Sequence, residues 1–118
     1  MSKKIIPKES ELSILQAELI DQYFRAQRGI EAYQKEIELL PRGYISNKII
    51  SGKAYSYLQW REGKKVHSRY IKKSELESVV IEIRKRRARE ESIKRLEDSM
   101  KDIIKFMGRE LIEYYAEK

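Results

Sequence analysis

The spacing of apolar residues changes twice along this chain, and these changes constrain its fold more than any other feature. Between positions 10 and 40, and again between 74 and 117, apolar residues recur mostly at intervals of three or four. That interval is the period of an amphipathic α-helix. Between 43 and 73, stretches rich in Tyr, Ile, Val, Ser and Trp replace it, and most of these residue types favour strands. The pattern therefore predicts two long helices separated by a β segment.

Two turn candidates divide the middle segment into three strands. Ser51-Gly52 and Glu62-Gly63 each lie between strand-forming stretches, a pattern typical of β-hairpins. The predicted strands cover residues 44–50, 53–61 and 64–71. The sequence thus predicts an α+β fold in the order α-β-β-β-α, in which two long helices flank a three-stranded antiparallel sheet.

Alternation along the predicted strands assigns each side chain to one of two sheet faces. If both turns are two-residue loops, Ile50 pairs with Lys53 and Arg61 pairs with Lys64. The more aliphatic face carries Ile45, Asn47, Ile49, Ala54, Ser56, Leu58, Trp60, Lys65, His67, Arg69 and Ile71. The other face carries Tyr44, Ser46, Lys48, Ile50, Tyr55, Tyr57, Gln59, Val66, Ser68 and Tyr70. We expect the first face to pack on the helices, because phenol rings suit a half-solvated surface.

Capping and breaking residues set the expected helix ends. Ser10 is the expected N-cap of the first helix, and Pro41 ends that helix. Ser74 and Glu77 have the spacing of a capping box at the start of the second helix, in which Gly108 is the expected place for a bend. We expect a single domain over residues 1–118, with a helix over 10–40, a sheet over 43–73 and a long helix over 74–117.

The two helices are expected to form an antiparallel hairpin or coiled coil, joined by the sheet. Counting residues outward from the sheet along both helices places Ile83 beside Tyr33. The apolar positions between 93 and 114 also provide a possible surface for a homodimer.

The positive charge of the chain is concentrated in the predicted sheet. The formal net charge is +7, and residues 42–73 contain nine Lys or Arg residues and a single acid, Glu62. Concentrated basic charge attracts nucleic acids or acidic protein surfaces. A second basic cluster, 84–89, interrupts the apolar stripe of the last helix.

The sequence patterns of common catalytic and metal sites are absent from the chain. The chain has no cysteine and a single histidine, His67, so a zinc site lacks ligands. Nucleotide-binding glycine motifs and nucleophile motifs are also missing. We therefore expect a non-catalytic protein without a cofactor or metal. The lack of cysteine fits a cytoplasmic location, and no apolar run reaches the ~18 residues of a membrane span.

Basic and aromatic residues together identify the candidate binding site. Lys and Arg neutralise phosphates, and aromatic rings stack on exposed bases. The predicted nucleic-acid-binding residues are Lys48, Lys53, Tyr55, Tyr57, Arg61, Lys64, Lys65, Arg69, Lys72, Lys73, Arg84, Arg86 and Arg87.

The hairpin sequence adds two resemblances. The run Gly52-Lys53-Ala54-Tyr55-Ser56-Tyr57-Leu58-Gln59-Trp60-Arg61-Glu62-Gly63, of the form Gly-Lys-x-Tyr-x-Tyr-Leu-Gln-x-Arg-Glu-Gly, resembles the hairpin of a small uncharacterised family of bacterial proteins. The family's usual pattern is Gly-Lys/Glu-Tyr-x-Tyr-Leu-Gln-x-Arg-Glu-Gly, and this chain inserts Ala54 before the first tyrosine. That resemblance implies a bacterial or mobile-element origin. The order of strands and Gly-Lys turns is similar to the arm-binding domain of tyrosine integrases, which implies DNA contact through Tyr55, Tyr57, Arg61, Lys64, Lys65 and Arg69.

Three functions follow as hypotheses. The first is a nucleic-acid-binding accessory or regulatory protein whose partner is DNA or RNA. The second is a protein-interaction module, such as a phage inhibitor or adaptor that binds the acidic surface of a host nucleoprotein complex. The third is a structural helical protein that dimerises through its C-terminal helix.

Overall fold

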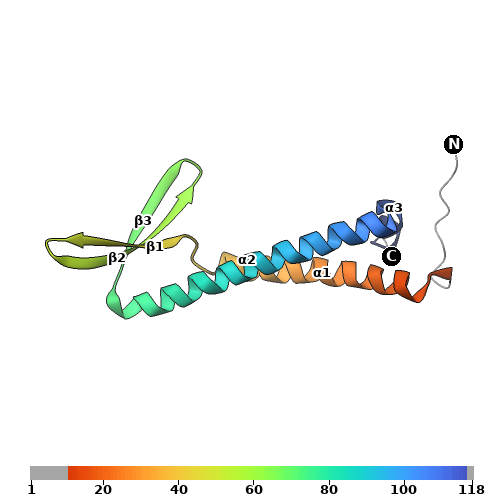
Figure 1. Ribbon diagram of the computed structural model, residues 1–118, viewed down its shortest axis with the longest axis horizontal. Coiled ribbons are helices and arrows are strands. Elements are labelled where there is room, and N and C mark those ends of the chain that lie inside the picture. The colour runs from red at the N-terminus through yellow and green to blue at the C-terminus, as the bar shows by residue number, and fades with distance from the viewer. Residues whose placement is uncertain (1–10, 117–118) are drawn as a thin grey trace. The chain divides into compact units, whose positions relative to one another are not determined.

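The computed structural model describes residues 11–116 and confirms the α+β fold (Figure 1). The chain divides into two compact units. The sheet unit consists of residues 33–91, and the helical unit consists of the described residues up to Ala32 and from Ser92 onward. Helices α1 (Ile14–Glu38) and α2 (Lys73–Met107) each contribute to both units, whereas α3 (Arg109–Ala116) belongs to the helical unit.

The first helix begins later than predicted. The Ser13 N–H donates to Gln16 Oε1, and the Gln16 N–H donates to Ser13 Oγ, both at 3.0 Å. This reciprocal pair is a capping box, which satisfies two backbone donors at the start of the helix. The predicted N-cap, Ser10, lies outside the described residues. The helix ends at Glu38, three residues before the proline that was expected to stop it.

The prediction over residues 74–117 is wrong in expecting one unbroken helix but right about the position of its bend, because α2 ends at Met107 and α3 starts at Arg109. Gly108 between them has φ +91°, a conformation that glycine adopts without the steric cost of a side chain. The capping-box prediction is also wrong, because α2 already begins at Lys73. The carbonyl of Lys72 accepts from the N–H groups of Glu75 and Leu76, which places Ser74 inside the first turn.

No helix within residues 11–116 combines the length and apolar character needed to cross a membrane.

The three strands form one antiparallel sheet in the order β1-β2-β3 (Figure 1). Their bounds are Tyr44–Ile50, Lys53–Glu62 and Lys65–Ile71. The first hairpin has the predicted register, with Ile50 opposite Lys53. The second hairpin turns at Gly63-Lys64, so Arg61 pairs with Val66 and not, as predicted, with Lys64.

The error in the second hairpin leaves the two sheet faces unchanged. The observed pairing is shifted by two residues from the predicted one, and side chains alternate with a period of two. Every strand residue therefore remains on its predicted face.

The aliphatic face of the sheet is the buried one, as predicted. Leu58 and Ile71 are 4% and 1% exposed, and they pack against Val79 and Ile83 of α2. Ile45, Trp60 and Leu76 complete this cluster. Burying an aliphatic side chain of this size contributes about 1.5–3 kcal/mol, which fixes the orientation of the sheet on α2. The opposite face therefore stays open to solvent.

The helical unit has its own core. Ile20 of α1, Ile103 of α2 and Ile112 of α3 are buried together, with Tyr23 and Met107 packed around them. A Cβ atom added to Gly29 would lie 3.1 Å from Leu96 Cδ1, so the helices approach closely there. The apolar residues of α2 in this unit therefore pack largely against α1 and α3 of the same chain.

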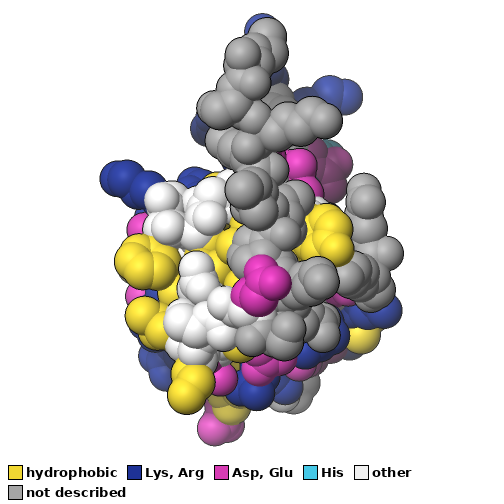
Figure 2. All heavy atoms as spheres, turned by 90° about the vertical axis from the view of Figure 1, so that its right-hand side faces the viewer, with side chains coloured by type: hydrophobic (Ala, Val, Ile, Leu, Met, Phe, Trp, Pro, Cys, Tyr) yellow, Lys and Arg dark blue, Asp and Glu magenta, His cyan; other side chains and the backbone are white. Residues whose placement is uncertain are grey.

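One apolar surface of the helical unit remains uncovered by residues 11–116. Phe106 is 68% exposed, and a groove of about 380 Å³ is lined by Phe106, Leu15, Leu19, Asp102 and Ile103. Figure 2 faces the end of this unit and shows hydrophobic side chains at the surface among charged ones.

The helices in the sheet unit have a different register from the predicted one. The Arg89 guanidinium lies over the Tyr33 ring, with 5.3 Å between the guanidinium carbon and the ring centroid. The sequence had predicted Ile83 at this position. The register differs because the first turns of α2 pack on the sheet through Val79 and Ile83. The end of α1 therefore meets α2 almost two turns further along than a simple helical hairpin predicts.

Candidate nucleic-acid interface

The sheet face opposite the core carries an alternating set of tyrosines and cations, and we refer to it as the tyrosine face. The register places its side chains on one side of the pleat. The tyrosine face comprises Tyr44, Lys48, Lys53, Tyr55, Tyr57, Arg61 and Tyr70, with Ser46, Ile50, Gln59, Val66 and Ser68 between them. None of these residues is buried.

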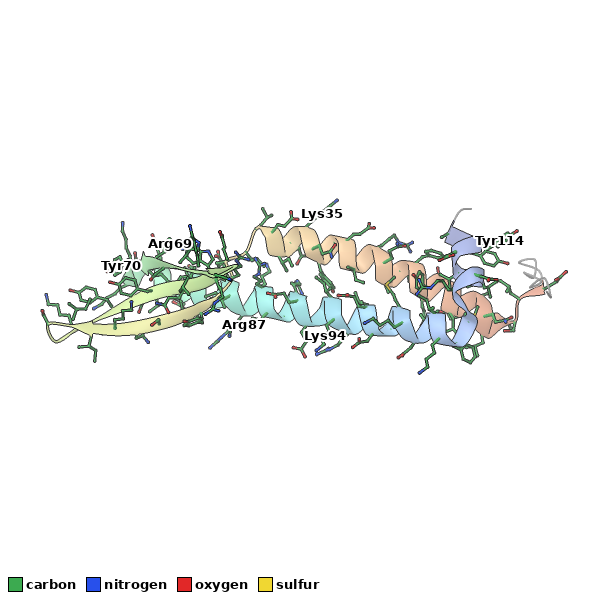
Figure 3. All side chains as sticks on the ribbon, turned by 90° about the horizontal axis from the view of Figure 1, so that it is seen from above. Lys35, Arg69, Tyr70, Arg87, Lys94 and Tyr114 are labelled. Carbon is green, nitrogen blue, oxygen red and sulfur yellow. The ribbon has the colours of Figure 1, made fainter. Side chains whose placement is uncertain are left out.

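The tyrosine rings on this face contact each other across the strands. Tyr57 and Tyr70 are direct cross-strand partners, with ring centroids 5.8 Å apart in an edge-to-face arrangement. Tyr55 lies diagonally across from Tyr70, at 6.1 Å. Tyr70 remains 48% exposed and is labelled in Figure 3, and Tyr44 is 52% exposed. The rings therefore form a partly solvated aromatic surface.

Cations lie among these rings, and none of them pairs with an acid of residues 11–116. Lys48 Nζ is 4.9 Å from the centroid of the Tyr57 ring, within the range of a cation–π contact. Lys53 and Arg61 lie on the same face and are exposed, and Lys64 occupies the turn beside it. The strand positions of this face contain no Asp or Glu, and Lys48, Lys53 and Arg61 form no ion pair with any residue of 11–116. Their charge is therefore uncompensated.

Two predicted site residues lie on the opposite, helix-side face. Lys65 is exposed there, and Arg69, which is labelled in Figure 3, is 3.9 Å from a carboxylate oxygen of Glu75. Glu62, also on this face, lies 3.2 Å from an Arg42 nitrogen and 3.5 Å from His67 Nε2. The pleat therefore separates Lys65 and Arg69 from the tyrosine face, and the thirteen predicted residues do not form one site.

Much of the arginine run has intramolecular partners. Arg86, with a side chain 19% exposed, donates from Nη1 to the carbonyls of Ile37 and Leu40, both at 2.6 Å, and from Nε to Glu90. Charged donors are favourable at a helix C-terminus, where carbonyls lack helical partners. Arg86 therefore caps α1.

Neighbouring arginines support the same connection. Arg87, labelled in Figure 3, donates to the carbonyl of Gly43 at 3.0 Å, and Arg89 donates to Glu36 at 2.6 Å. Arg84 is exposed and remains available. The run thus connects α2 to the end of α1 within the sheet unit, and Arg86 is unavailable for an external ligand.

A cavity opens at the corner of the sheet where β3 ends, and we refer to it as the notch. Ile71 is the last residue of β3 and pairs with Ser56, so residues 53–55 of β2 pair with β1 alone. The notch has a volume of about 720 Å³. It is lined by Lys53, Ala54, Tyr55, Ser56, Tyr70, Ile71, Lys73 and Leu76. It therefore adjoins the tyrosine face through Lys53, Tyr55 and Tyr70.

A protein-family model described as a domain of unknown function, DUF6788, matches residues 4–80, which is well over half of the chain. The chain belongs to the DUF6788 family. The expectation that the chain belongs to an uncharacterised family is thereby confirmed, whereas the hairpin pattern and the similarity to integrases stay predictions. No curated protein and no solved structure matches the chain.

The DUF6788 match contains the tyrosine face and the notch. It includes all three strands and the start of α2, but it ends before Arg84, Arg86 and Arg87. Two residues of the tyrosine face, Tyr44 and Tyr70, were missing from the predicted site. Their signal was present in the sequence, because both alternate in step with Tyr55 and Tyr57 on the same predicted face.

Proposed function

We propose that this member of the DUF6788 family is a non-catalytic nucleic-acid-binding protein whose tyrosine face contacts the polynucleotide. The observation that carries the proposal is the placement of Lys48 over the Tyr57 ring, beside Tyr70, on an open surface without acids. Phosphates require cations, and bases offer flat aromatic faces. A surface that alternates both groups matches the alternation of phosphate and base along a strand.

The proposed interface is smaller than the set of residues predicted from the sequence. It retains Lys48, Lys53, Tyr55, Tyr57, Arg61, Lys64 and Lys73 and adds Tyr44 and Tyr70. Lys65 and Arg69 are left out because they lie on the helix-side face. Arg86 is left out because it caps α1. In this proposal the helices support the sheet, and only the first turn of α2 reaches the interface.

The test is a salt series measured by fluorescence anisotropy with labelled DNA and RNA oligonucleotides. The test variant carries Lys48→Gln, Lys53→Gln and Arg61→Gln, which remove the three cations of the tyrosine face. The matched control carries Arg28→Gln, Lys94→Gln and Lys101→Gln, which remove the same charge from exposed positions of the helical unit. Lys94 projects away from α1 in Figure 3.

We expect the wild-type protein and the control to bind with an affinity that falls steeply with salt. Each phosphate contact to a single strand contributes about 0.7 to the slope of log K against log salt concentration. The tyrosine-face variant should therefore show a slope that is shallower by about 2. Equal slopes and affinities for the test and control variants would refute the proposal.

The same variants discriminate the principal alternative, a protein-interaction module. That alternative predicts that no variant binds an oligonucleotide. It also predicts that a pull-down from nuclease-treated bacterial lysate still retains an acidic protein partner. The proposal includes an accessory or regulatory role on phage or other mobile-element nucleic acid, because the hairpin resembles that of a bacterial or mobile-element family.

A further inference from the structure

We propose that the notch receives an unpaired base, so that the tyrosine face takes single-stranded rather than duplex nucleic acid. This inference rests on the proposed function and specifies its ligand class. It extends the interface from a charged aromatic surface to a cavity in which one nucleotide is enclosed.

The lining of the notch has the chemistry of a nucleotide. Ala54 and Leu76 provide apolar contact. Lys53 and Lys73 form no ion pair with any residue of 11–116, so their ammonium groups can bind a phosphate. An apolar floor with cations in the lining suits a flat base attached to a phosphate.

The backbone of β2 offers hydrogen-bonding groups at the same place. Residues 53–55 have a strand partner only on the β1 side, because β3 ends opposite Ser56. Their remaining amide and carbonyl groups point toward the missing strand, as at any sheet edge. Such groups are suited to the donors and acceptors along the edge of a base.

The volume of the notch fits a single nucleotide. At about 720 Å³ it lies within the range of ~300–1,000 Å³ typical of small-molecule sites. Tyr55 and Tyr70 belong both to its lining and to the tyrosine face. A strand that crosses the tyrosine face therefore reaches the notch without leaving the aromatic surface.

A duplex fits this surface less well than a single strand. In a duplex the faces of the bases are stacked on one another, and only their edges are open in the grooves. Arg, Lys, Asn and Gln read those edges, whereas rings stack on the faces of unpaired bases. The tyrosine face has four tyrosines and one side-chain amide, Gln59, while Lys48, Lys53 and Arg61 are assigned to phosphates, which single strands and duplexes both carry. Its composition therefore favours unpaired bases.

The test compares three probes of about 12 nucleotides at one salt concentration, a length within the usual site sizes of single-strand binders. The probes are an oligothymidine, its duplex with oligoadenine, and an abasic strand that keeps every phosphate. We expect the oligothymidine to bind about tenfold more tightly than the other two probes, because stacking on one base is typically worth about fivefold to a hundredfold. An oligouridine arm distinguishes RNA from DNA.

Two variants locate the preference. The pair Tyr55→Leu and Tyr70→Leu removes rings but no charge, so affinity for oligothymidine should fall about tenfold with an unchanged salt slope. Ala54→Leu narrows the notch and should reduce the same affinity. Ser78→Leu, on the exposed surface of α2, is the control for added bulk. Circular dichroism confirms that each variant is folded.

The outcomes separate this inference from the proposed function. If duplex and abasic probes bind as tightly as oligothymidine, while the triple glutamine variant weakens all three, the notch inference is wrong and the proposed function stands. If no probe binds, both are wrong. Loss of selectivity for oligothymidine in Ala54→Leu but not in Ser78→Leu supports the notch directly.

Discussion

Substitution of Arg86 should destabilise the sheet unit more than substitution of any other arginine in its run. The guanidinium donates two hydrogen bonds of 2.6 Å to carbonyls at the end of α1, and it is only 19% exposed at the side chain. Hydrogen bonds to charged groups contribute about 1.5–3 kcal/mol each. Because water can replace part of the loss, Arg86→Met should lower the free energy of unfolding by about 3 kcal/mol.

Urea unfolding followed by circular dichroism measures this change. Small proteins have m-values of ~1–3 kcal/mol/M in urea, so a loss of about 3 kcal/mol lowers the midpoint by ~1–3 M. Arg86→Lys keeps the charge but loses the planar set of guanidinium donors, so we expect a loss of unfolding free energy between those of the wild type and Arg86→Met. Arg84→Met, at an exposed position of the same helix, should stay within about 0.5 kcal/mol of the wild type. Equal midpoints for Arg86→Met and Arg84→Met would show that the cap contributes nothing.

Three further substitutions test the sheet, each by thermal or urea unfolding. Leu58→Ala empties a site that is 4% exposed and should cost about 2–5 kcal/mol, so a loss below ~1 kcal/mol would contradict the assigned core. Gly43→Ala should be at least as damaging, because its Cβ would lie 2.0 Å from the carbonyl oxygen of Gln59 at φ +108°, and a neutral result would exclude this close approach. Ser51→Asn should stabilise by several tenths of a kcal/mol, because residue 51 has φ +52° in a two-residue turn, and destabilisation would contradict that geometry.

The strands could be predicted because several local signals agree. The alternation of Tyr55 and Tyr57 with Ala54 and Leu58 assigns faces without any knowledge of the partner strands. The second turn was misplaced because Glu62-Gly63-Lys64 allows two positions for the loop. A loop starting at Gly63 puts the single glycine at the first central position, where a type II′ turn needs positive φ, and Gly63 has φ +59°.

The pairing of the helices could not be predicted from their apolar pattern. Leu76, Val79 and Ile83 have the spacing of a helix stripe, but spacing does not reveal whether the stripe packs on a helix or a sheet. In the structure these residues pack on the sheet core. That arrangement brings Arg86 and Arg89 opposite the end of α1, where apolar residues were expected.

The candidate site was predictable in its residue types and less so in its limits. Lysines and tyrosines of alternating strand positions fall on one face by the pleat alone. The role of Arg86 was hidden, because a basic run on a helix has the same sequence whether it is solvated or caps carbonyls. The notch depends on where β3 ends relative to β2, and the misplaced second turn concealed it, because the predicted register pairs Ile71 with Ala54 whereas the observed one pairs it with Ser56.

Backbone amide shifts on titration with oligothymidine test the central claim most directly. With the ¹⁵N-labelled protein, the proposal predicts the largest changes at Lys48, Tyr57 and Tyr70 of the tyrosine face and at Lys73 of the notch. Residues 14–32 and 92–107 of the helical unit should change little. Changes confined to that unit, or no changes at saturating oligonucleotide, would contradict the account.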